Sequence, residues 1–208
     1  MRGLIKKDLK SLLLQGKVLL VLLAFYIALF FLSYNEGGVS LLSAMIAMLG
    51  VLLPITALGY DEKAQWDRYA LTMPISRSML VWSKYLLSLL IALCGALLLL
   101  ALLLLQPAWD MQEGLSVAWS MLGVNLLLSA VIYPVYFKLG AEKGRYAMMA
   151  ILFIPTILFL ILGKAGLHLP PISEQAAMAA LVSFPLLAGA IFLVSGFISC
   201  GLYRKKEF

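Results

Sequence analysis

Long apolar runs are the feature of this sequence that most constrains its fold. A run of about 20 apolar residues suffices to cross a bilayer as a helix, and six such runs cover most of the 208 residues. They are residues 17–34, 39–60, 80–105, 115–137, 146–163 and 178–203. Pro185 inside the last run leaves open a short outer half-helix before the sixth span. Hydrophobic residues make up 63% of the chain and charged residues 12%, so the sequence predicts an all-α polytopic membrane protein with six transmembrane helices and one transmembrane domain over residues 1–208.

Basic residues predict the orientation, because Lys and Arg are retained on the cytoplasmic side of a membrane. With a cytoplasmic N-terminus, fifteen of the sixteen Lys and Arg residues fall inside and only Lys164 falls outside. Both termini are therefore expected to be cytoplasmic, and the net charge of +6 reflects topology and not nucleic-acid binding. Residues 18–31 are apolar and follow a basic segment, a pattern that also occurs in signal peptides. No small-x-small cleavage pattern comes after them, so a first transmembrane helix is favoured over a signal peptide.

The N-terminal segment, residues 1–16, has an amphipathic pattern. One face is predicted to carry Leu4, Ile5, Leu9, Leu12 and Leu13, and the other Lys6, Lys7, Lys10 and Ser11. This pattern predicts an in-plane helix at the cytoplasmic interface, with its lysines toward anionic headgroups of the membrane lipid. A simple extension of the first span is the alternative.

The centres of the six runs contain no Asp, Glu, Lys, Arg or His, which argues against an ion-coupled transporter or a proton pump. Four polar or aromatic residues in the fourth run are candidates for a substrate path, with helix packing as the alternative: Asn125, Ser129, Tyr133 and Tyr136. The only histidine, His168, has no second metal ligand near it, and no phosphate-loop motif is present. We therefore expect no catalytic, metal or nucleotide site in this chain, so energy for any transport must come from a partner.

The longest polar interruption is residues 61–85, DEKAQWDRYALTMPISRSMLVWSKY. A helical spacing of i, i+3, i+4 and i+7 aligns Trp66, Tyr69, Ala70 and Met73. The pattern predicts a helix over residues 61–73, with Asp61 and Glu62 at its N-terminal end, Pro74 ending it, and Ser76 capping the next helix. This segment is either an ordinary interfacial loop or an amphipathic helix that docks in a groove on a cytosolic partner.

These residues resemble a motif of ATP-binding-cassette (ABC) type-2 exporter permeases, in the segment after their second span. The matching residues are Trp66, Asp67, Tyr69, Thr72, Met73, Pro74, Ile75, Ser76, Arg77, Lys84 and Tyr85. The expected architecture is similar as well: an amphipathic entry helix, six spans and no nucleotide site. The compact chain is similar to bacterial permeases that export antimicrobial peptides and phenol-soluble modulins.

The resemblance implies a permease in the bacterial cell membrane that works with a second permease copy or paralogue and with two cytosolic ABC ATPase subunits, which carry ATP and Mg²⁺. Residues 61–79 would be the coupling segment, and residues 139–146 a smaller second contact. The implied partner-coupling residues are Asp61, Glu62, Trp66, Asp67, Tyr69, Met73, Pro74, Arg77, Glu142 and Arg145. The expected cargo is an amphipathic or hydrophobic molecule, a peptide above all, that is moved out of the cell. The alternative is a non-transporting anchor, immunity or sensor subunit for a cytosolic protein.

Overall fold

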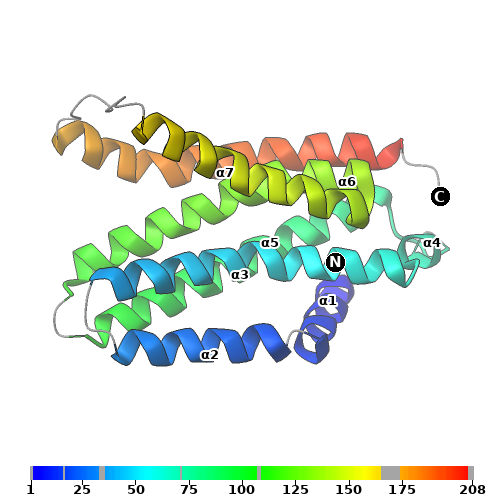
Figure 1. Cartoon of the computed structure of the whole chain (residues 1–208). Coiled ribbons are helices and arrows are strands. Elements are labelled where there is room, and N and C mark those ends of the chain that lie inside the picture. The colour runs from blue at the N-terminus through cyan, green and yellow to red at the C-terminus, as the bar shows by residue number, and fades with distance from the viewer. Residues whose placement is uncertain are drawn as a thin grey trace.

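The computed structural model of the chain is helical (Figure 1). It describes residues 2–15, 17–32, 36–70, 72–106, 109–164 and 174–205, and within these ranges it contains no strand. The helices are α1 (Arg2–Gln15), α2 (Lys17–Leu32), α3 (Glu36–Lys63), α4 (Trp66–Ala70), α5 (Arg77–Leu104), α6 (Met111–Lys164) and α7 (Glu174–Arg204).

Among the described residues, four helical stretches are long and apolar enough to cross a membrane: Gly38–Lys63, Arg77–Leu104, Met111–Gly140 and Ala179–Arg204. They belong to α3, α5, α6 and α7, which run side by side in Figure 1 and pack against one another. The first predicted span corresponds to α2, where the apolar stretch is shorter, Leu20–Leu32. The fold is therefore that of a multi-pass helical membrane protein.

Helix α6 reverses direction at Gly140, where the backbone has φ 80° and ψ 176°. A positive φ of this kind strongly favours glycine, because glycine has no Cβ to clash with the backbone. The reversal separates an arm of residues 111–139 from an arm of residues 141–164, and Figure 1 shows the second arm turning back toward the opposite end. The second arm contains residues 146–163, the predicted fifth span.

Helix α7 continues through Pro185, so the possible break into a short outer half-helix does not occur. At this point α7 packs closely on α6. Gly123 lies so close to α7 that a Cβ on it would be 2.8 Å from the Phe184 ring and 3.0 Å from the Pro185 Cα. The two backbones thus pack directly against each other, which supports α7 where proline removes a helical hydrogen bond.

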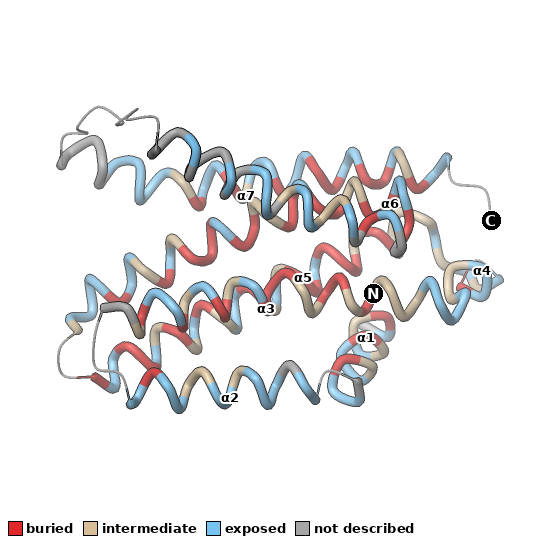
Figure 2. The backbone as a smooth tube through the Cα atoms, in the orientation of Figure 1, coloured by how far each residue is buried: buried red, intermediate tan, exposed pale blue. Residues whose placement is uncertain are grey.

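The main core lies between α3, α5, α6 and α7, and Figure 2 shows buried positions along their facing sides. At its centre the rings of Tyr85 and Tyr133 meet edge to face, with centroids 4.8 Å apart. The Ser195 hydroxyl donates to the Ala130 carbonyl at 2.6 Å, so in its 2.8 Å contact with Tyr85 it accepts the phenol proton. Tyr85 in turn accepts from Ser199 at 2.8 Å. This chain of hydrogen bonds joins α5, α6 and α7 within the apolar interior.

Candidate partner-coupling site

Segments distant in the sequence meet at the end of the molecule that carries α4, which we call the α4 end (Figure 1). The Gly140 reversal lies there, since a Cβ on Gly140 would be 2.8 Å from Oε1 of Glu62. The end of α7 lies there as well, because Nη1 of Arg77 donates to the Arg204 carbonyl at 2.8 Å. The α4 end thus brings the predicted coupling segment, residues 61–79, together with the predicted second contact, residues 139–146.

The expected helix over residues 61–73 was wrong in its boundaries. Helix α3 continues to Lys63, a turn follows in which Gln65 has φ 49°, and α4 comprises only Trp66–Ala70. Asp61 and Glu62 consequently lie at the C-terminal end of α3, where the helix dipole does not favour acids. The expected cap is confirmed: the Ser76 hydroxyl accepts from the Met79 amide at 3.3 Å at the start of α5.

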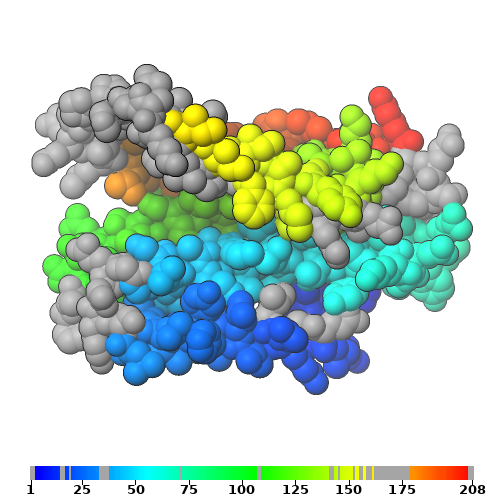
Figure 3. Space-filling model, viewed as in Figure 1, coloured from blue at the N-terminus to red at the C-terminus, as the bar shows by residue number. Residues whose placement is uncertain are grey.

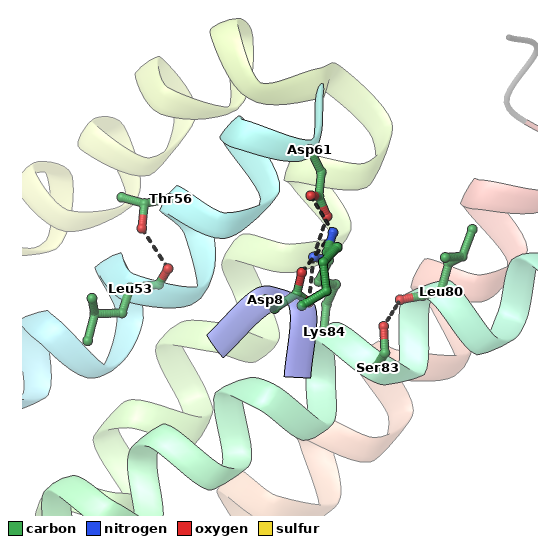
Figure 4. Close-up of polar contacts among 8 residues, drawn as sticks. Asp8, Leu53, Thr56, Asp61, Leu80, Ser83 and Lys84 are labelled. Carbon is green, nitrogen blue, oxygen red and sulfur yellow. Dashed lines mark hydrogen bonds and ion pairs between the residues drawn. The ribbon is translucent and has the colours of Figure 1, made fainter. Parts of the chain in front are cut away.

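Asp61 instead belongs to a group of four charged residues that we call the lysine–aspartate cluster: Lys7, Asp8, Asp61 and Lys84 (Figure 4). Nζ of Lys84 contacts Asp8 at 2.7 Å and Asp61 at 2.5 Å. Nζ of Lys7 contacts Asp61 at 2.6 Å and Asp8 at 2.9 Å. The Asp8 side chain is 1% exposed and that of Lys84 8%. Two positive and two negative charges compensate each other, as buried ions require, and they link α1, α3 and α5.

Trp66 connects α4 to this cluster. Nζ of Lys7 lies 4.3 Å from the centroid of the Trp66 ring, within the range of a cation–π interaction. Trp66 also packs against the main core and lines a small cavity of about 40 Å³ beside the cluster, together with Asp67 and Tyr203. The indole is therefore an inward anchor for α4.

Tyr69 is the outward member of the predicted aromatic stripe. Its side chain is 59% exposed, while its ring stays 5.5 Å from that of Trp66. Met73 is half-buried and Pro74 is exposed. In the second predicted contact Lys143 and Tyr146 are exposed, whereas the side chains of Glu142 and Arg145 lie outside the described part of the structure.

The four candidate substrate-path residues are all buried within the single chain. Asn125 is 0% exposed and its Nδ2 donates to the Ala47 carbonyl of α3 at 3.1 Å. Ser129 accepts from the Ser88 hydroxyl of α5 at 3.1 Å. Tyr133 is part of the central aromatic core, and Tyr136 lines the small cavity at the α4 end. In this conformation all four side chains lie in contacts between helices of the one chain. Their role in a substrate path stays a prediction.

The sequence reasoning missed the role of Asp8. The spacing of Leu4, Asp8 and Leu12 places all three on one face of α1, and the structure buries all three. Leu9 and Leu13, two further leucines of the predicted apolar face, are exposed on the outside of the protein, and the in-plane position of α1 stays a prediction. The signal in the sequence was that Asp8 lies four residues from Leu4 and four from Leu12, on the apolar face of the helix. A buried carboxylate at this position needs a basic partner inside the protein.

The structure thus defines a multi-pass helical membrane protein in which the lysine–aspartate cluster, whose charges balance, lies beneath the short surface helix α4. Within the described residues no group of three or more His, Cys, Asp or Glu side chains could hold a metal ion. The model of the family described as "ABC-2 family transporter protein" matches residues 3–204, and the chain belongs to this family. A search of curated proteins finds no significant match to the sequence.

Proposed function

We propose that this chain is the permease subunit of an ABC exporter that moves an amphipathic or hydrophobic cargo, a peptide above all, out of a bacterial cell. The observation that carries the proposal is the family match over residues 3–204, which implies association with ABC ATPase subunits. In this proposal six spans cross the cell membrane, both termini and the α4 end are cytoplasmic, and α1 lies in the interface. ATP and Mg²⁺ bind to the partner, and two permease copies or paralogues work with two ATPase subunits.

The surface at the α4 end supports docking of the ATPase there. Tyr69 offers an exposed aromatic ring on α4, and Trp66 ties the same helix to the interior. Among the described residues, the segments that meet at the α4 end carry one exposed acid, Glu62, and several exposed cations, namely Lys63, Arg68, Lys138, Lys143 and Arg204. A partner groove with an aromatic pocket and an acidic rim would complement this surface.

An open groove between α3 and α6 supports an amphipathic cargo. The groove has a volume of about 460 Å³ and combines three serines, Ser43, Ser116 and Ser120, with small and apolar side chains. Each of these hydroxyls donates to a carbonyl of its own helix, at 3.0, 2.7 and 2.8 Å respectively. Their free lone pairs can therefore accept from N–H or O–H groups of a cargo whose other face is apolar.

The test is ATP hydrolysis by the co-purified complex in lipid nanodiscs, with and without amphipathic peptides. Tyr69→Ala removes the exposed ring, and Phe25→Ala on α2 is the matched control, since these side chains are 59% and 58% exposed. If Tyr69 is an interface hot spot worth about 2 kcal/mol, its loss weakens ATPase binding about 30-fold.

Peptide-stimulated hydrolysis that is lost in Tyr69→Ala and kept in Phe25→Ala would support the exporter. An ATPase that binds at the α4 end but ignores every peptide would favour the non-transporting anchor. Failure of any ATPase to co-purify would contradict the exporter and leave an anchor for another cytosolic protein as the remaining candidate.

A further inference from the structure

The outer surface of α1 carries charge of one sign. Lys6 and Lys10 are exposed, and among the described residues neither makes an ion pair. The only acid of α1, Asp8, is turned inward and compensated by Lys7 and Lys84. The cluster is neutral by itself, so the outward lysines have no counter-charge within it. Their natural complement is an anionic surface outside the protein.

Exposed leucines lie beside these lysines. Leu9, Leu13 and Leu14 are all exposed on α1, and Lys17 is exposed at the start of α2. A surface helix that shows both leucines and lysines fits the boundary between acyl chains and headgroups. Figure 1 shows α1 at a steep angle to the long helices, and Figure 3 shows its surface beside that of α2 along one edge of the molecule. In a membrane crossed by the long helices, α1 therefore lies closer to the plane of the leaflet than they do.

The inner surface of α1 is connected to the coupling segment. Lys7 and Asp8 directly follow Lys6 in the same helical turn, and together they contact Asp61 at the end of α3 and Lys84 in α5. Lys7 also contacts the Trp66 ring of α4. Because these contacts are short, a shift of α1 in the leaflet would move Lys7 and Asp8 relative to Asp61, Trp66 and Lys84.

We propose that the outer surface of α1 binds anionic lipid headgroups, and that the lysine–aspartate cluster transmits this binding to Trp66 and α4. Anionic lipid then holds α1 in the interface, and α1 holds the coupling segment in the ordered position seen here. The importance of this effect for transport rests on the proposed function, whereas the lipid response of α1 and α4 does not.

The test uses the full chain without an ATPase, in nanodiscs of phosphatidylcholine alone or of equal parts phosphatidylcholine and phosphatidylglycerol. Amide hydrogen exchange is followed in residues 2–15 and 61–73. One lysine near an anionic surface contributes a factor of about five to binding, so phosphatidylglycerol is expected to slow exchange of α1 at least about fivefold. Exchange in residues 61–73 is expected to slow in parallel, and added salt weakens both effects.

Three variants separate the steps. Lys6→Gln with Lys10→Gln removes the outer charges and is expected to abolish the lipid effect in both segments. Lys138→Gln with Lys205→Gln removes the same charge from exposed positions elsewhere at the α4 end and is expected to keep it. Lys7→Met removes the contacts of α1 with the Trp66 ring and the direct contact of Lys7 with Asp61 but keeps the bridge from Asp8 through Lys84 to Asp61. The effect is therefore expected to persist in residues 2–15 and to weaken in residues 61–73.

The proposal is overturned if phosphatidylglycerol leaves the exchange of α1 unchanged, or if the two double variants lose the effect equally. It is also overturned if residues 61–73 respond to lipid as strongly in Lys7→Met as in the wild type. Because no ATPase is present, each of these results leaves the proposed transport function untouched.

Discussion

Replacement of Lys84 by Met tests whether the buried charges stabilise the fold as a compensated set. Lys84 contacts Asp8 at 2.7 Å and Asp61 at 2.5 Å, and at an effective dielectric constant of about 20 the first contact corresponds to a Coulomb energy of about 6 kcal/mol. Much of this is offset by the desolvation of the ions, and loss of one partner from a buried pair typically costs about 3–5 kcal/mol. Because Lys7 still contacts both carboxylates, we expect Lys84→Met to lower the free energy of unfolding by about 3 kcal/mol.

A second substitution distinguishes charge balance from simple loss of packing. Lys84→Met alone leaves one cation with two carboxylates, whereas Lys84→Met with Asp8→Leu leaves the neutral pair Lys7 and Asp61. The double variant is therefore expected to regain most of the lost stability, because an apolar replacement of a buried ion pair is often neutral or better. Lys138→Met, at an exposed position, is the control and is expected to stay within about 0.5 kcal/mol of the wild type.

The assay is unfolding in mixed micelles with sodium dodecyl sulfate, followed by far-ultraviolet circular dichroism. The reasoning is refuted if Lys84→Met is as stable as Lys138→Met. It is refuted as well if the double variant is less stable than Lys84→Met, because the carboxylate of Asp8 would then stabilise the fold without Lys84, through Lys7 alone.

Three further predictions use the same assay. Ser195→Ala removes the hydrogen-bond donor to the Ala130 carbonyl and the acceptor of the buried Tyr85 hydroxyl, which keeps only its bond from Ser199, and is expected to cost about 1–3 kcal/mol. Ser183→Ala, whose hydroxyl bonds within its own helix, is expected to cost less than about 0.5 kcal/mol, and equal losses would contradict the bridge. Gly50→Ala introduces a Cβ that overlaps the Asn125 carboxamide and is expected to cost about 1–3 kcal/mol, with non-additivity toward Asn125→Ala as the sign of direct contact. Gly140→Ala is expected to cost at least about 1–2 kcal/mol because of its positive φ, while Gly201→Ala, with open space around it, is expected to be neutral or stabilising by up to about 1 kcal/mol; a tolerated alanine at Gly140 would show that the reversal can form without the positive φ.

The coupling segment shows where prediction from sequence failed and why. Helical periodicity identified Trp66 and Tyr69 as neighbours on one helix, and their rings do lie 5.5 Å apart. Periodicity cannot determine which side of a five-residue helix faces the protein, so it did not separate the inward Trp66 from the exposed Tyr69. The start of α4 was also misplaced, because Asp61 and Glu62 fit the N-terminal end of one helix as well as the C-terminal end of another. Asp61 is stabilised there by two lysines, one of them from the first turns of the chain.

The sequence by itself determined that this protein is built from helices that cross a membrane, because only long apolar helices satisfy their backbone hydrogen bonds in lipid. It also determined the local signals that the structure follows, such as the Ser76 cap, which depends on residues three positions apart. Only the tertiary structure decided that Lys7, Asp8, Asp61 and Lys84 meet, since they lie up to 77 positions apart in the sequence and on three helices. Buried charges attract one another only at distances set by helix packing, and no local pattern in the chain encodes that geometry.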